Sequence, residues 1–159
     1  MSDADVTIRR AKSRDMAFIV ELWKQLSREH AELDGRFALR PEAEIVWARW
    51  AGQRLRDEAS IVLIAERGED CVGYLLGHAD EAQPIFEKRS YGTVTDLFVV
   101  PESRRKGIGS RLLEEALAFF RSRNIGHVRL NVLAKDERTL AFYKTHGFGD
   151  FLHRMWKSI

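Results

Sequence analysis

Apolar residues recur along the first third of this chain with the spacing of a strand and then of helices. The pattern predicts a strand over residues 6–10, a helix over about 13–29, a loop over 30–37 and a second helix over 41–55. Ser13 suits the N-cap of the first helix, and Pro41 suits the first position of the second. This part therefore predicts one strand followed by two amphipathic helices.

The middle of the chain has the pattern of antiparallel strands. Ile61–Ala65 is an unbroken apolar run, which suits a strand that is covered on both faces. Residues 68–70 suit a tight turn into a second strand over 71–79. After a polar connection over 80–89, residues 91–100 predict a third strand.

The last third alternates between helices and strands. The pattern predicts an amphipathic helix from Ile108 to about Asn124, a strand over 127–133, a helix from Asp136 to His146 and a strand over 151–156. Because a helix joins the strands over 91–100 and 127–133, these two should be parallel. The order β-α-α-β-β-β-α-β-α-β predicts a single mixed α/β domain over residues 1–159, with its core at about 6–157 and a mostly antiparallel sheet.

Composition narrows the class of protein. Hydrophobic residues make up 45% of the chain and charged residues 31%, as in ordinary globular domains, and no apolar run reaches membrane-spanning length. The net charge of +2 is too small for a general attraction to nucleic acid or membranes, so neither partner is predicted. The polar N-terminus lacks a signal-peptide pattern, which predicts a cytoplasmic protein. Cys71 is the single cysteine, and its apolar setting favours a buried structural thiol.

One segment carries a chemical signal. Residues 99–110, VVPESRRKGIGS, run from an apolar strand through a basic, glycine-containing turn into a helix. The first N–H groups of a helix have no intrahelical partner, and the helix dipole adds positive charge there, so a phosphate is favoured at that end. Gly107 and Gly109 leave room for a ligand to approach the backbone, and Arg104–Lys106 add full charges. The segment predicts a pyrophosphate site at the end of a strand.

Residues 104–109, Arg-Arg-Lys-Gly-Ile-Gly, resemble the signature of the GNAT superfamily of acetyl-CoA-dependent N-acetyltransferases: Gln or Arg, two residues, Gly, one residue, Gly or Ala. A second family pattern has Asn, two residues, Ala, three residues, Tyr and then Gly-Phe. This chain has Asp136, Thr139, Tyr143 and Gly147-Phe148 in those places. A dinucleotide-binding fingerprint would need a third glycine and an earlier position, and the lysine of a Walker A loop is missing. The order of elements is also similar to the family from Val6 onward.

The resemblance implies a fold and a cosubstrate. In the family, helices cover both faces of the sheet, and the two parallel strands splay so that the pantetheine arm of acetyl-CoA lies between them. Backbone N–H groups of the first strand polarise the thioester carbonyl. No metal is predicted, because the histidines of this chain show no metal-ligand spacing with acids or thiols. The binding residues implied here are Leu97, Phe98, Val99, Arg104, Arg105, Lys106, Gly107, Ile108, Gly109, Ser110, Asn131, Asp136 and Tyr143.

The resemblance also implies catalytic residues. Tyr143 matches the tyrosine that protonates the leaving thiolate, and many members place a Glu or His general base eight or nine residues before the motif, where this chain has Asp96 and Thr95. Thr95 cannot be a base. Strand alternation would turn Asp96 to the opposite face unless a bulge redirects it. Asp96 as the base, Asp96 as a structural hydrogen-bonding residue and a relay of water molecules all stay open.

Two further positions bear on the site. Asp136 replaces the family asparagine, so its helix-capping role is retained while its contact with the pantetheine is in doubt. The loop over 30–37 occupies the place of one wall of the family's acceptor site, although a solvated polar loop fits its residues equally well.

The sequence therefore predicts an N-acetyltransferase that acts on a primary amine of a small molecule or a peptide. The departures at Thr95 and Asp136 also fit a catalytically silent acyl-CoA sensor. Apolar residues in the strand predicted over 151–156 could add an edge for a homodimer. The identity of the acceptor lies beyond what fold-level resemblance can predict.

Overall fold

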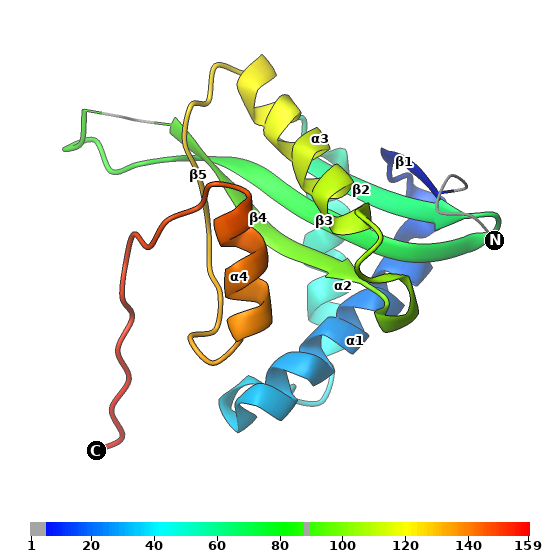
Figure 1. Cartoon of the computed structure of the whole chain (residues 1–159), viewed down its shortest axis with the longest axis horizontal. Coiled ribbons are helices and arrows are strands. Elements are labelled where there is room, and N and C mark those ends of the chain that lie inside the picture. Colours follow the sequence, from blue (N-terminus) through cyan, green and yellow to red (C-terminus); the bar gives the residue numbers. More distant parts are fainter. Residues whose placement is uncertain (1–5, 88–89) are drawn as a thin grey trace.

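A computed structural model describes residues 6–87 and 90–159 of the chain (Figure 1). Its elements are β1 (Val6–Arg10), α1 (Met16–Leu33), α2 (Ala43–Arg56), β2 (Ser60–Arg67), β3 (Asp70–Glu81), β4 (Ser90–Val99), α3 (Ile108–Ser122), β5 (Val128–Leu130) and α4 (Glu137–Thr145). Short 3-10 helices lie at Ser13–Asp15, Gly35–Phe37 and Pro101–Ser103. All predicted elements except the last strand are present, in the predicted order.

The strands form one five-stranded sheet in the order β1-β2-β3-β4-β5. β1 to β4 are antiparallel neighbours, whereas β4 and β5 are parallel and pair from Gly92 opposite Val128 to Val94 opposite Leu130. The predicted mixed sheet with one parallel pair is confirmed, although β5 is shorter than the predicted range of 127–133.

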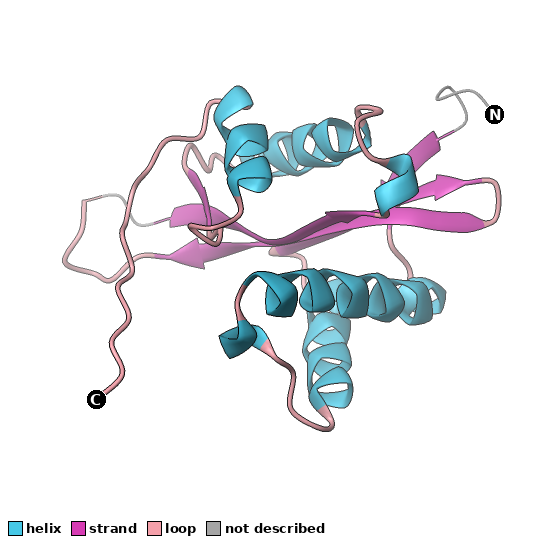
Figure 2. Ribbon diagram, turned by 60° about the horizontal axis from the view of Figure 1, so that its bottom comes forward, coloured by secondary structure: helices cyan, strands magenta, loops and turns pink. Residues whose placement is uncertain are grey.

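Helices cover both faces of the sheet (Figure 2). β2 shows why the run Ile61–Ala65 is apolar throughout. Ile61, Leu63 and Ala65 pack in the core on the side of α3 and α4, while Val62 and Ile64 pack in the core on the side of α1 and α2. A strand buried on both faces has no polar position in its middle, as the sequence predicted.

The contact between α3 and β4 depends on a missing side chain. Phe120 of α3 is fully buried, and a Cβ added to Gly92 of β4 would lie 2.7 Å from its ring. Glycine therefore lets the Phe120 ring lie directly on the strand, close to the place where β4 pairs with β5.

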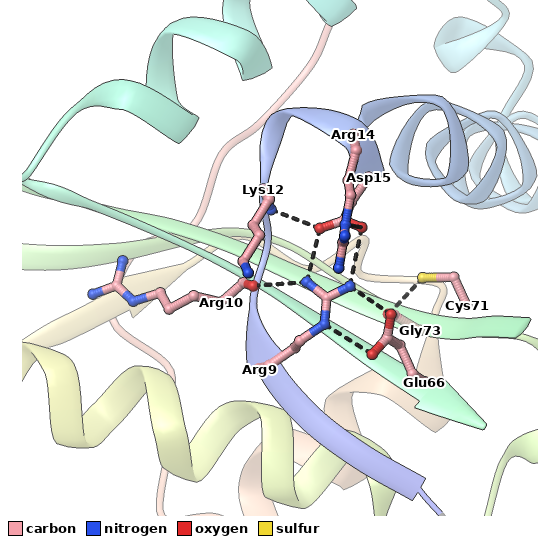
Figure 3. Close-up of polar contacts among 8 residues, drawn as sticks. All are labelled: Arg9, Arg10, Lys12, Arg14, Asp15, Glu66, Cys71 and Gly73. Atoms are coloured by element: carbon pink, nitrogen blue, oxygen red, sulfur yellow. Dashed lines mark hydrogen bonds and ion pairs between the residues drawn. The ribbon is translucent and has the colours of Figure 1, made fainter. Parts of the chain in front are cut away.

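An ion-pair cluster holds the connection between β1 and α1 (Figure 3). The Arg9 guanidinium donates to both carboxylate oxygens of buried Asp15, at 2.8 and 3.0 Å, and to Glu66 of β2. Asp15 also accepts the Lys12 backbone N–H at 2.6 Å. Asp15, rather than the predicted Ser13, thus provides the side-chain hydrogen bond where the helix begins.

Two helix boundaries differ from the prediction. α1 continues past Glu29 to Leu33, because no helix-breaking residue occurs before Gly35, so only part of the predicted loop over 30–37 is non-helical. α2 begins at Ala43 rather than at Pro41, after Glu42 adopts a left-handed conformation with φ 65°.

The predicted strand over 151–156 is wrong. The C-terminal segment (residues 149–159) contains no strand or helix, and it passes beyond the edge of the sheet from the side of α4 to the side of α1 (Figure 2). A strand requires a neighbour with which to exchange backbone hydrogen bonds, and this segment has none in the described part of the chain. Across the described residues, no helix is long and apolar enough to cross a membrane.

Candidate functional site

Residues 104–110, where the sequence predicts a pyrophosphate site, are called the phosphate loop below. They follow the 3-10 helix after β4 and lead into the first turn of α3. Arg105 and Gly107 both adopt left-handed conformations, with φ values of 59° and 75°, and the helix begins at Ile108. Only a residue without a Cβ adopts such a conformation at little cost, which explains the glycine directly before the helix. The first N–H groups of α3 therefore follow shortly after the end of β4 and have no partner within the helix.

The Arg104 guanidinium is bonded within the protein. Its Nε donates to the Val99 carbonyl at 2.7 Å, its Nη2 donates to Glu29 of α1 at 2.5 Å, and its guanidinium lies over the Phe98 ring. The charge of Arg104 is therefore balanced within the protein. Arg105 and Lys106 are the exposed cations of the phosphate loop.

The parallel pairing of β4 and β5 stops at Val94 and Leu130. From Asp96 to Val99, β4 continues to pair with β3 on its other side, while no ladder joins it to the chain after Leu130 in the described ranges. β4 thus has a stretch of backbone with one free side, and this stretch contains the predicted residues Leu97 and Val99. The place where β4 and β5 stop pairing is called the opening below. Asn131, directly after β5, is exposed on the β5 side of it.

A β-bulge redirects Asp96. Leu76 of β3 faces Asp96 and Gly77 faces Val94, so Thr95 is an extra residue without a partner in β3. Thr95 contacts His78, and the Asp96 carboxyl approaches the Tyr74 hydroxyl, which places both on the α1–α2 side of the sheet. The bulge therefore turns two consecutive side chains to one face, where simple alternation would have separated them.

The Asp96 carboxyl lies in an apolar environment. Its Oδ2 and the hydroxyl of fully buried Tyr74 are both buried, and neither has a hydrogen-bond partner of good geometry among the described residues. Burial raises the pKa of Asp96 to about 7, and the nearby Tyr74 hydroxyl opposes that rise. A carboxyl group with such a pKa can accept a proton near neutral pH.

Tyr143 is buried in the core on the side of the sheet covered by α3. The centroid of its ring lies 5.1 Å from that of Phe142 and 5.5 Å from that of Phe148, and these contacts hold the side chain in place on α4. Burial raises the pKa of Tyr143 above its usual range, and the negative charges of Asp96 and Asp136 raise it further. Tyr143 therefore keeps its proton at neutral pH and lies within electrostatic reach of Asp96.

Asp136 caps α4, as the sequence predicted. Its Oδ1 accepts the Thr139 N–H at 3.0 Å, and Gly147 ends the helix with φ 82°. On the neighbouring turn, His146 Nδ1 donates to the Phe142 carbonyl at 2.8 Å, so its Nε2 is free to accept the Ser110 hydroxyl at 3.0 Å. This pair joins α4 to the phosphate loop.

Sequence reasoning missed the contacts that join α1 to the site. Glu29 bonds both Arg104 and, at 3.3 Å, Arg138 of α4, and Asp34 lies 3.5 Å from Lys135. Asp34 also accepts from Arg36, which holds the pKa of the Asp34 carboxyl well below its usual range. The partners are far apart in the sequence, so no local pattern could have indicated them.

The described residues provide neither a reactive thiol nor a cluster of metal ligands. Cys71 is half-buried, and burial raises the pKa of its thiol to about 11, so it stays protonated as expected for a structural residue. No cluster of three or more His, Cys, Asp or Glu side chains suitable for a metal ion occurs within residues 6–87 and 90–159.

A family model and a relative of this chain indicate the same family. The model of the acetyltransferase (GNAT) family matches residues 19–148. An uncharacterized N-acetyltransferase of Bacillus subtilis, YhfO, is 28% identical over 158 residues, covering 93% of this chain and 95% of that protein.

Two solved structures have a similar fold. A tetramutant of the BH1408 protein from Bacillus halodurans has a TM-score of 0.86 and 22% identity, covering 96% of this chain and 99% of that one. A predicted acetyltransferase from Clostridium acetobutylicum, solved with acetyl-CoA, has a TM-score of 0.76 and 19% identity, covering 96% of both chains. At these identities the two structures show the fold alone.

Proposed function

The chain belongs to the acetyltransferase (GNAT) family, and we propose that it transfers an acetyl group from acetyl-CoA to a primary amine of a small molecule or a peptide. The observation that carries this proposal is the opening where β4 and β5 stop pairing, which lies next to the phosphate loop. Asp96 lies on the α1–α2 side of the sheet and Tyr143 on the α3 side, close enough to influence each other electrostatically. The C. acetobutylicum structure with acetyl-CoA supports the choice of cosubstrate. The cytoplasmic location stays a prediction from the sequence.

The residues around the opening fit acetyl-CoA. The free N–H groups at the start of α3, with Arg105 and Lys106 beside them, would bind the pyrophosphate. Between Asp96 and Val99, the side of β4 away from β3 has no strand partner. Apart from the Val99 carbonyl, which accepts from Arg104, its backbone groups can hydrogen-bond the amides of the pantetheine arm as a neighbouring strand would. Acetyl-CoA itself supplies an activated acetyl thioester.

The backbone of β4 also has a chemical role in the proposal. The N–H groups of Leu97 and Val99 point away from β3, whereas that of Phe98 points toward it, so Leu97 or Val99 would donate to the thioester carbonyl oxygen as negative charge develops on it. Losing one donor of this kind typically costs about 3 to 4 kcal/mol of barrier lowering. Because the donor is a backbone group held by the β3–β4 ladder, it requires no reorganisation during the reaction.

Two side chains would move protons. The amine nitrogen attacks the thioester carbon and the carbon–sulfur bond breaks, so the nitrogen must lose a proton and the sulfur must gain one. Asp96, with a pKa of about 7, accepts the proton from the amine directly or through water. Tyr143 keeps its proton at neutral pH and donates it to the thiolate.

The test is acceptor-dependent release of free thiol. The protein is mixed with acetyl-CoA and a panel of amines that includes polyamines, aminosugars and peptides with free α- and ε-amino groups. Turnover on at least one amine, reduced in Tyr143→Phe by about 10²-fold or more, supports the proposal. Tight binding of CoA without turnover on any amine would instead identify an acyl-CoA sensor, and failure of both binding and turnover would rule out both functions.

A further inference from the structure

A network of hydrogen bonds runs across β3 and β4 beside the bulge at Thr95. The Thr95 hydroxyl lies 3.3 Å from Nδ1 of His78 on β3, and Nε2 of the same ring lies 3.1 Å from Oδ2 of Asp80. Asp80 Oδ2 also accepts the Thr93 hydroxyl at 2.7 Å. Four side chains are thus joined in one network, and its Thr95 end lies directly next to Asp96.

The network determines which nitrogen of His78 carries the proton. The Asp80 carboxylate can only accept hydrogen bonds, so the Nε2 that faces it carries the N–H. In the neutral ring, Nδ1 then has a lone pair, which accepts the Thr95 hydroxyl. The imidazole is therefore oriented as a base toward Thr95, in the way that a carboxylate orients the histidine of a catalytic triad.

His78 is uncharged at neutral pH. Its side chain is only 15% exposed, and burial lowers its pKa below the usual 6.5. The guanidiniums of Arg54 on α2 and Arg129 on β5 lower this pKa further, whereas the carboxylates of Asp80 and Asp57 oppose the change. The ring is thus ready to accept a proton at neutral pH, and its own titration lies at lower pH.

The proposed reaction releases one proton more than Asp96 can hold. Aliphatic amines are ammonium ions at neutral pH, as the pKa of about 10.4 for a lysine side chain illustrates. The nitrogen of an ammonium ion must lose one proton before it can attack the thioester and a second as the amide forms. Asp96 accepts one of the two, and Tyr143 is a donor in this reaction. The other proton requires a second acceptor.

We propose that His78, acting through the Thr95 hydroxyl, accepts the first of these protons, so that the acceptor substrate enters the site as an ammonium ion. The ammonium nitrogen gives a proton to the Thr95 oxygen while the hydroxyl passes its own proton to Nδ1, which leaves a neutral amine and an imidazolium. Asp80 stabilises the imidazolium until it releases the proton to water. Thr95 touches the substrate in this step, whereas His78 and Asp80 are positioning residues that act through it. The inference rests on the proposed acetyl transfer.

The exposure of each group fits its place in this sequence of transfers. Thr95 is exposed, so an acceptor arriving from solvent can reach its hydroxyl, whereas Oδ2 of Asp96 is buried. At the other end of the network, the Asp80 side chain is 30% exposed, which gives the proton a way out to water. The Trp50 ring of α2 lies perpendicular to the His78 imidazole, with the ring centroids 6.4 Å apart, and packs against it on the side of the helices.

The experiment compares variants on two acceptors that differ in basicity. An amine that the protein acetylates is paired with its β-fluorinated analogue, which has nearly the same shape but is less basic and so arrives more often as the neutral amine. His78→Ala and Thr95→Val should each lower kcat/KM by about 10²-fold with the basic amine and far less with the analogue. Thr95→Ser, which keeps the hydroxyl, should behave as the wild type. His153→Ala, at an exposed histidine of the C-terminal segment, is the matched control.

Three kinetic outcomes would overturn the proposal. An equal loss with both acceptors would mean that His78 and Thr95 only support the local structure. A loss in Thr95→Ser as large as that in Thr95→Val would show that the hydroxyl is not the group that matters. Full activity in both His78→Ala and Thr95→Val would mean that the proton leaves by another route. All three differ from failure of the proposed function, in which the wild-type protein acetylates no amine.

Nitrogen NMR of the unmodified protein tests the network without turnover. Near neutral pH the His78 ring should be uncharged, with the proton on Nε2 and none on Nδ1, and Asp80→Asn should change the balance between the two tautomers. A ring that carries its proton on Nδ1, or one that is charged at neutral pH, would overturn the proposal, because neither can accept a proton from Thr95.

Discussion

The carboxylate of Glu29 and the guanidinium of Arg104 form an ion pair at 2.5 Å that joins the end of α1 to the phosphate loop. The same guanidinium donates to the Val99 carbonyl, and the same carboxylate accepts from Arg138 of α4. Three elements around the opening are thus held by one pair of side chains. In this arrangement the Arg104 guanidinium holds the phosphate loop against α1 and β4, and its predicted contact with a phosphate stays a prediction.

Replacing Glu29 by Gln should lower the affinity of the phosphate loop for acetyl-CoA. Both side chains are partly buried, so the lost interaction corresponds to about 1 kcal/mol, or roughly a fivefold increase in the KM for acetyl-CoA. The kcat should change little, because neither residue touches the reacting atoms in the proposed mechanism. Steady-state kinetics with Glu32→Gln, an exposed position on the same helix, as control would test this, and an unchanged KM would contradict it.

Tyr143→Phe should separate binding from chemistry. The Phe ring can keep the contacts with Phe142 and Phe148, so the affinity for CoA should remain within about twofold of the wild-type value. Loss of the hydroxyl removes the proposed acid, and kcat should fall by about 10²- to 10⁴-fold. Tyr91→Phe serves as the control substitution. A kcat within a few-fold of wild type would exclude Tyr143 as the proton donor.

Hydrophobic periodicity was sufficient to predict most of the fold, because buried elements must present apolar residues to a core. It failed at Phe151–Trp156, where the residue types suit a strand but no neighbouring strand is present. The role of Arg104 could not be predicted because its partner Glu29 is 75 positions away in the sequence. The position of Asp96 depends on a one-residue bulge at Thr95, which simple alternation does not indicate.

The buried ion pair at the start of α1 should make the fold sensitive to acid. Hydrogen bonds from Arg9 lower the pKa of Asp15 below 3.8, so the folded state holds this carboxylate ionised more strongly than the unfolded state does. Its contribution is present above the unfolded pKa and is lost as the pH falls through the folded pKa. Asp15→Asn should cost about 2 kcal/mol at pH 7, or roughly 4–8 °C in Tm.

Thermal unfolding at pH 7 and at pH 3 checks this prediction. The difference in Tm between the wild type and Asp15→Asn should shrink at the lower pH, whereas Glu69→Gln in the exposed turn after β2 should leave Tm unchanged at pH 7. A difference that is equal at both pH values would show that the charge of Asp15 is not what stabilises the fold.

The pH profile of the proposed reaction should report Asp96. A general base works as the carboxylate, so kcat/KM should rise with pH through about 7 and then level off. Asp96→Asn should lower the plateau and remove this limb. The measurement needs an acceptor whose own amine does not titrate in the same range. A limb that persists in Asp96→Asn would favour the relay of water molecules.

Stability provides a second readout for Asp96 that does not require turnover. Burial raises the pKa of this carboxyl to about 7 in the folded state, so ionising the group opposes folding. The folded state is therefore most stable while the group is neutral, and this stability is lost as the pH rises from 3.8, the ordinary pKa of the group, to about 7. Asp96→Asn removes the titration. Its effect on Tm, relative to wild type, should therefore be more favourable at pH 8 than at pH 5.

Tyr74→Phe should shift the rise of kcat/KM with pH to another pH without removing it. The Tyr74 hydroxyl opposes the rise in the pKa of Asp96, so its loss should shift the midpoint of kcat/KM to higher pH while the plateau at alkaline pH is retained. If the midpoint stays in place, Tyr74 has no electrostatic influence on the base, whatever the change in the absolute rate.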